Sequence, residues 1–96
     1  MISSNHMRVD ISTLGTSLVS RPLGREAALA LIGNMLTALS PSEPVELDFS
    51  QVLALTPSWA DEFMRTLRRD FSARLKIIAG DNASVRLALQ TVGEKL

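Results

Sequence analysis

The sequence predicts a small α/β domain with the order β(β)αβαβα, in which a mixed sheet of about four strands is covered by about three helices. Short apolar segments with the period-2 alternation of a strand are separated by longer segments in which apolar residues recur every three or four positions. The chain has 96 residues, 46% of them apolar, which is enough for one domain with a modest core. Right-handed crossovers between successive strand–helix–strand units then favour parallel pairing of the later strands.

The N-terminal part of the chain predicts two short strands separated by a turn. Arg8–Ile11 alternates and contains β-branched residues, and Ser17–Ser20 has a similar pattern, with the turn near Gly15. The two segments are compatible with a hairpin, which adds an antiparallel element to the sheet.

The first helix is predicted from about Gly24 to Leu39. Arg21–Gly24 breaks the extended run before it, and Ser40–Pro44 supplies a stop signal and a loop after it. Its apolar residues form one wide face: Ala28, Leu31, Ile32, Met35, Leu36 and Leu39. Gly33 costs about 1 kcal/mol relative to alanine at this place, and we expect it to allow a close approach of the helix to the sheet.

The segment 45–71 combines the central strand with the second helix. Its first residues alternate apolar and acidic side chains as a buried strand does: Val45, Glu46, Leu47, Asp48 and Phe49. The next apolar residues are expected to carry the chain under the core: Val52, Leu53 and Leu55. Thr56 then caps a helix whose first position is Pro57, because no amide hydrogen is needed there. Asp61 and Glu62 follow near the positive end of the helix dipole. The buried stripe of this helix is predicted to be Ala60, Phe63, Met64, Leu67 and Phe71.

The C-terminal part predicts a last strand and a last helix. Leu75–Ala79 reads as a strand that is closed by Gly80 and Asp81. Asn82 is a good cap for a helix from Ala83 to about Thr91, and Gly93 is a plausible terminator. The buried face of this helix is predicted to be Val85, Ala88, Leu89 and Val92.

The central segment resembles STAS domains, the fold of bacterial anti-sigma-factor antagonists, and more closely the small STAS-like domains of unknown function. The resemblance is carried by the strand Leu47–Val52, the turn Thr56–Ser58 and the helix opening Ala60–Glu62. It implies a STAS-like fold over most of the chain after about residue 8, and a role in binding another protein. It also implies an anti-sigma factor or a related histidine-kinase-type ATPase as the partner, in bacterial transcriptional or stress signalling.

The resemblance makes Ser58 a candidate for phosphorylation. In anti-sigma-factor antagonists the turn after the central strand carries a serine that a partner kinase phosphorylates, and Ser58 falls at this position. A phosphate adds about −1.5 to −2 charge at a docking surface, so modification would break a protein contact without unfolding the domain. The usual Asp-Ser-Ser-Gly turn is absent, and Thr56–Trp59 stands in its place. The alternative is that Thr56 and Ser58 only satisfy amides of the first helical turn.

The partner-binding surface implied by this resemblance is formed by Thr56, Pro57, Ser58, Trp59, Asp61 and Glu62. Trp59 is the only tryptophan, and it either lies in the core or anchors an interface. Asp61 and Glu62 point in different directions on a helix, so they cannot act as an acid/base pair on one substrate atom. Asp61 instead has the four-residue spacing of a surface ion pair with Arg65.

Charge and composition leave a binding module as the main class of function. Ten Lys and Arg balance ten Asp and Glu, which gives little support for attraction to nucleic acid or an anionic membrane. The alternative function is a small nucleic-acid- or nucleotide-binding module that uses the helix face of Arg65, Arg68 and Arg69. The chain has no cysteine and a single histidine, His6, so it can assemble neither a zinc site nor a Ser-His-Asp triad. We therefore expect no enzymatic activity, no metal and no cofactor.

We expect no secretory signal at the start of this sequence. Residues 1–7 lack the apolar region of a secretory signal, and no stretch approaches the roughly twenty apolar residues of a spanning helix. We expect this segment to be disordered or a remnant of an expression vector, and place the STAS-like domain at 8–96. A cytoplasmic location without membrane contact follows as an expectation, whereas the oligomeric state is left open.

Overall fold

Strands and helices alternate along the residues that the computed structural model describes, which are 7–34, 36, 43–71 and 74–96. The elements in chain order are β1 (Met7–Asp10), the 3-10 helix η1 (Ile11–Leu14), β2 (Ser17–Leu18), α1 (Arg21–Asn34), β3 (Val45–Asp48), β4 (Ala54–Leu55), α2 (Pro57–Phe71), β5 (Leu75–Ile78) and α3 (Ala83–Thr91). This is the predicted succession with η1 and β4 added. The expectations for residues 1–6, for Met35 and Leu39, and for most of the loop before Pro44 lie outside the described residues.

The described strands form two small sheets in which every pairing is parallel. β1, β3 and β5 form a sheet in the order β1-β3-β5, while β2 pairs with β4 in a separate two-stranded sheet. The predicted hairpin and the mixed sheet of about four strands are therefore wrong. The small α/β class and the parallel pairing of the later strands are confirmed.

The first turn explains why no hairpin forms. Asp10 caps η1, because its carboxylate accepts hydrogen bonds from the backbone N–H of Ser12 (3.0 Å) and from its hydroxyl (2.6 Å). Residue Ile11 thus begins a 3-10 turn instead of ending the strand. Gly15 ends the turn with a φ of 136°, and β2 then runs beside β4 rather than back along β1.

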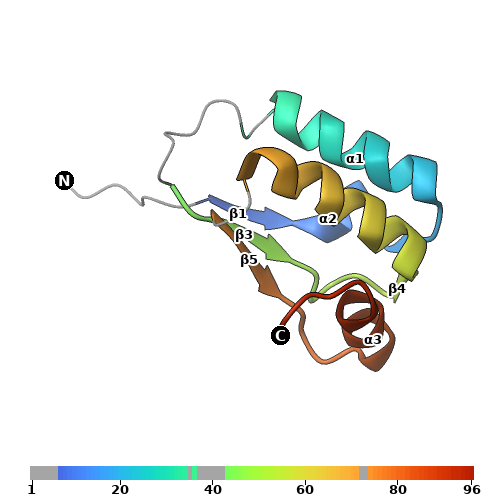
Figure 1. Ribbon diagram of the computed structural model, residues 1–96. Helices are drawn as coiled ribbons and strands as arrows, with labels where there is room; N and C mark the ends of the chain where they lie inside the picture. Colours follow the sequence, from blue (N-terminus) through green and yellow to red (C-terminus); the bar gives the residue numbers. More distant parts are fainter. Residues whose placement is uncertain (1–6, 35, 37–42, 72–73) are drawn as a thin grey trace.

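One layer of helices covers one face of the three-stranded sheet. α1 and α2 lie side by side across it, and α3 packs against α2 and β4 at the end where the strands finish (Figure 1). Strand alternation directs one set of side chains toward the helices: Met7, Val9, Val45, Leu47, Leu75 and Ile77. The opposite face is largely polar and includes exposed Arg8, Asp10 and Lys76.

α1 begins earlier than predicted. The hydroxyl of Ser20 accepts from the N–H of Leu23 (3.4 Å), so residues 21–24 form the first helical turn and do not break the chain. Pro22 is tolerated there because the first turn needs no amide hydrogen from it. The close approach expected at Gly33 occurs instead at Gly24, since a Cβ on Gly24 would lie 2.5 Å from the carbonyl oxygen of Trp59, whereas Gly33 faces open space.

The predicted core of the second half is confirmed with two exceptions, Leu53 and Val92, of which Val92 is only half-buried and lies just after α3. The α2 stripe is buried at every predicted position: Ala60, Phe63, Met64, Leu67 and Phe71. The backbone N–H of Leu53, just before β4, donates a hydrogen bond to the carbonyl of Thr16. The side chain of Leu53 lies outside the core and is 70% exposed. In α3, Asn82 accepts from the N–H of Ser84 and of Val85, which confirms the predicted cap. Among the described residues, no helix has the length and apolar character needed to cross a membrane.

Candidate functional site

Thr56 joins the end of β4 to the start of α2. Its hydroxyl accepts a hydrogen bond from the N–H of Trp59 (3.3 Å) and donates one to the carbonyl of Val19 (3.0 Å). Thr56 therefore caps the helix as predicted and also ties it to the segment that follows β2. Pro57 is the first residue of α2, as its fixed φ favours.

Ser58 is the second residue of α2 and is exposed. Its hydroxyl forms no hydrogen bond with any residue that the structure describes, so the capping alternative holds for Thr56 and not for Ser58. Pro57 beside it is exposed as well. Together the two residues form an open corner at the start of the helix.

Trp59 lies beneath this corner. It is 2% exposed and stacks on Phe63, with ring centroids 4.5 Å apart and an interplanar angle of 22°. Phe63 in turn meets Phe49 edge-to-face at 6.4 Å. Of the two alternatives for Trp59, burial is thus confirmed, and the side chain supports the corner from within instead of anchoring an interface.

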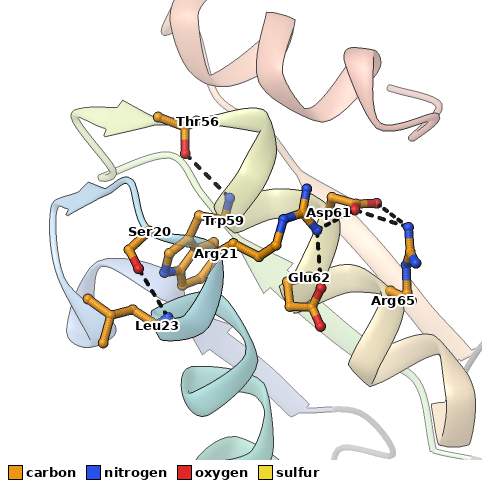
Figure 2. Close-up of polar contacts among 8 residues, drawn as sticks. All are labelled: Ser20, Arg21, Leu23, Thr56, Trp59, Asp61, Glu62 and Arg65. Carbon is orange, nitrogen blue, oxygen red and sulfur yellow. Dashed lines mark hydrogen bonds and ion pairs between the residues drawn. The ribbon is translucent and has the colours of Figure 1, made fainter.

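A charged cluster links the start of α1 to the second turn of α2. Arg21 donates to Asp61 (2.7 Å) and to Glu62 (3.1 Å), and Arg65 donates to Asp61 (3.0 Å), which confirms the predicted four-residue pair (Figure 2). The first turn of α2 contains no acidic residue, so the expected dipole role of Asp61 and Glu62 at the helix start is wrong. Hydrogen bonds from Arg21, and then from Arg65, lower the pKa of Asp61 below its ordinary value.

Arg21 is a site residue that sequence reasoning missed. Its partners lie far along the chain on another helix, and neither spacing nor periodicity connects them. The available signal was weaker: a Ser-Arg-Pro sequence is compatible with a helix start, and a residue in a first turn is often accessible.

An apolar pocket of about 330 Å³ opens beside the corner, between β2 and α1. Its walls include the exposed side chains of Val19 and Leu23, together with part of Trp59. Glu26 is the charged residue in this lining. The start of α2 therefore has an apolar hollow on one side and the charged cluster on the other.

The arginines of α2 do not form one continuous basic surface. Arg65 pairs with Asp61, whereas Arg68 pairs with Glu94 of the C-terminal segment. Arg65 and Arg69 line one pocket and Arg68 lines a different one. The alternative of a nucleic-acid-binding face made by Arg65, Arg68 and Arg69 thus gains no support from the geometry.

The described residues contain no group of three or more His, Cys, Asp or Glu side chains that could hold a metal ion. The carboxylates of Asp61 and Glu62 already accept hydrogen bonds from arginine. The arrangement at the start of α2 is suited to contact with another molecule.

Comparison with known families identifies one family for this chain. The profile of one family matches residues 27–85, from within α1 to the first turn of α3, and so includes the whole central strand and α2. Searches of curated proteins and of solved structures return no match. Because the profile covers more than half of the chain, the protein belongs to the family described as STAS-like domain of unknown function (DUF4325).

Proposed function

We propose that this domain is a non-enzymatic regulatory module that binds another protein through the start of α2. The observation that supports this most is the exposed hydroxyl of Ser58, which has no hydrogen-bond partner among the described residues and lies between the Thr56 cap and the buried Trp59. A rigid corner of this kind can be recognised without reordering of the domain. Such preorganisation favours binding because less entropy is lost.

The proposed contact surface combines an apolar centre with a polar rim, as protein interfaces commonly do. The apolar part is the pocket with Val19 and Leu23, and the polar part is Ser58 with the Arg21 cluster. From the residues predicted by sequence, Thr56, Pro57, Ser58, Asp61 and Glu62 stay in this surface, and Trp59 is its internal support.

The partner class follows from the family resemblance. We propose an anti-sigma factor or a related histidine-kinase-type ATPase, acting in bacterial transcriptional or stress signalling in the cytoplasm. The switch would be phosphorylation of Ser58. Asp61 and Glu62 lie three and four positions further along the helix, so a phosphate at residue 58 would share one face with two carboxylates. The surface would then change from nearly balanced to strongly negative, which disfavours a docked partner.

Charge substitution at Ser58 tests this proposal in a pull-down from the source cell. We expect Ser58→Asp to reduce recovery of one partner by about tenfold or more while the far-ultraviolet circular dichroism spectrum is unchanged. Ser84→Asp is a matched control, because Ser84 is the exposed second residue of α3 as Ser58 is of α2. Equal recovery with both variants and the wild type would contradict the proposal.

The phosphorylation step is tested separately by intact mass. Incubation with a candidate kinase of this class and ATP should add the mass of one phosphate to the wild type and none to Ser58→Ala. No mass gain with any candidate removes the switch but leaves the binding surface to be judged by the pull-down.

A further inference from the structure

Three arginines from two helices line one pocket whose lining does not include Ser58. Arg25 of α1 and Arg65 and Arg69 of α2 line a hollow of about 260 Å³, together with Glu62 and Thr66. Arg25 and Arg69 are exposed, and the side chain of Arg65 is 71% exposed. The arginine that shares this pocket with Arg65 and Arg69 is thus Arg25 from the neighbouring helix, and not Arg68.

The pocket holds excess positive charge. Glu62, its carboxylate, is paired with Arg21, and Arg65 is paired with Asp61. Arg25 and Arg69 form no ion pair with any residue in the described part of the chain. Two cationic groups thus line one hollow without a compensating anion among the residues that the structure describes.

We propose that this pocket binds a phosphate group, either as inorganic phosphate or as the phosphate of a small ester. A phosphate monoester carries about −1.5 to −2 charge at neutral pH, which matches the two uncompensated guanidinium groups, whereas a single carboxylate would leave one of them unbalanced. Guanidinium groups bind phosphate oxygens through two parallel hydrogen bonds. Thr66, which is 5% exposed and contributes to the lining, adds a hydroxyl to these donors. This site shares Glu62 and Arg65 with the charged cluster at the rim of the proposed contact surface, but its lining does not include Ser58, and the proposal does not rest on the proposed function.

Titration of the full chain with inorganic phosphate and with O-phosphoserine tests the proposal. Calorimetry at low ionic strength should show saturable binding of at least one of them, weakened at least about tenfold in Arg25→Gln/Arg69→Gln. Lys95→Gln is the control, because it removes an exposed cation outside the pocket and should bind as the wild type does. Tighter binding of O-phosphoserine identifies an ester as the ligand, and tighter binding of inorganic phosphate identifies the free ion.

The pH dependence gives a second and independent measurement. Affinity for O-phosphoserine should rise between about pH 5 and 7, because the second ionisation of a phosphate monoester lies near pH 6 while arginine stays charged, and affinity for sulfate should stay constant. In NMR spectra of the wild type, added phosphate should shift the backbone amide resonances near residues 25, 65 and 69. The proposal is overturned if neither ligand shows saturable binding, or if Lys95→Gln loses as much affinity as Arg25→Gln/Arg69→Gln. It is also overturned if the resonance shifts are spread evenly over the molecule.

Discussion

Asp48, at the end of β3, is a buried carboxylate that joins two neighbouring segments of this fold. Its side chain accepts from the N–H of Ser50 (2.9 Å) and from Arg8 of the adjacent strand (2.7 Å). The hydrogen bonds from Ser50, and then those from Arg8, lower the pKa of Asp48 below its ordinary value. The carboxylate therefore contributes to folding stability only while it is ionised.

Replacement of Asp48 should be costly at neutral pH and much less so in acid. We expect Asp48→Ala to lower the free energy of unfolding by about 1–3 kcal/mol at pH 7, because the Ser50 amide loses its acceptor. A lowered folded-state pKa gives stability that is present above the unfolded value of about 4 and is lost as the pH falls through the folded value. The difference between the two proteins should therefore shrink below pH 4.

Urea unfolding at pH 7 and at pH 3 measures this effect. Asp81→Ala is the control, because Asp81 is exposed and forms no ion pair among the described residues, and it should change stability by less than about 0.5 kcal/mol. A difference between wild type and Asp48→Ala that is the same at both pH values would refute the assignment.

Local side-chain chemistry could be predicted from sequence, and distant partners could not. The caps Thr56 and Asn82 were predictable because each accepts hydrogen bonds from amides two or three positions ahead. The exposure of Leu53 depends on how β4 aligns with β2, and the pairing of Arg21 with Asp61 depends on how two helices lie together. Neither leaves a periodic signal in the sequence.

At the scale of elements, the two covering helices touch through backbone at Gly24. A Cβ on this residue would lie 2.5 Å from the carbonyl oxygen of Trp59 and 3.2 Å from its Cα. The first turn of α1 is thus placed directly against the turn of α2 that presents Ser58. Only a residue without a side chain permits this distance.

Two glycine-to-alanine substitutions in the same helix should have opposite effects. Gly24→Ala should destabilise the domain by about 1–3 kcal/mol, because the added methyl group forces the two helices apart. Gly33→Ala should stabilise it by up to about 1 kcal/mol, because its Cβ meets open space and alanine favours helix. Thermal unfolding of both variants and the wild type checks the pair, and equal effects of the two substitutions would rule out the proposed contact.

Helices were more predictable than strand pairings for a physical reason. The apolar stripe of α2 extends over four turns, so the three- and four-residue spacing that identifies its buried face recurs several times in the sequence. β4 has two residues, which are too few to show the alternating pattern of a strand. The hairpin was therefore predicted from the two N-terminal segments alone, although β2 has its partner after the central strand.

On the scale of the whole molecule, one core lies between the helices and a sheet that is covered on one face. Parallel sheets are usually covered on both faces, and their strands are then apolar throughout. Here the face opposite α1 and α2 aligns Arg8, Glu46 and Lys76 across the three strands, so that positive, negative and positive side chains alternate. This charge pattern explains why the central strand has the alternating sequence Val-Glu-Leu-Asp, from which its position was predictable.

A single core predicts a single unfolding transition. Trp59, Phe49 and Leu47 belong to one buried cluster that includes residues of every helix and of both sheets. Tryptophan fluorescence and far-ultraviolet circular dichroism should therefore give the same urea midpoint. A fluorescence transition at clearly lower urea would show that the α2 corner unfolds separately.

The parallel pairing of every described strand also has a consequence for how quickly the chain finds this structure. Each ladder joins segments separated by an intervening helix, so no two-stranded nucleus can close through a short turn. The chain loses entropy when it closes these long loops, and it gains the stabilising contacts between strands only afterwards. This order slows folding in chains of this size. During synthesis β1 can pair only once β3 has emerged, and the three-stranded sheet can be completed only after β5, the last strand in the chain, has emerged as well.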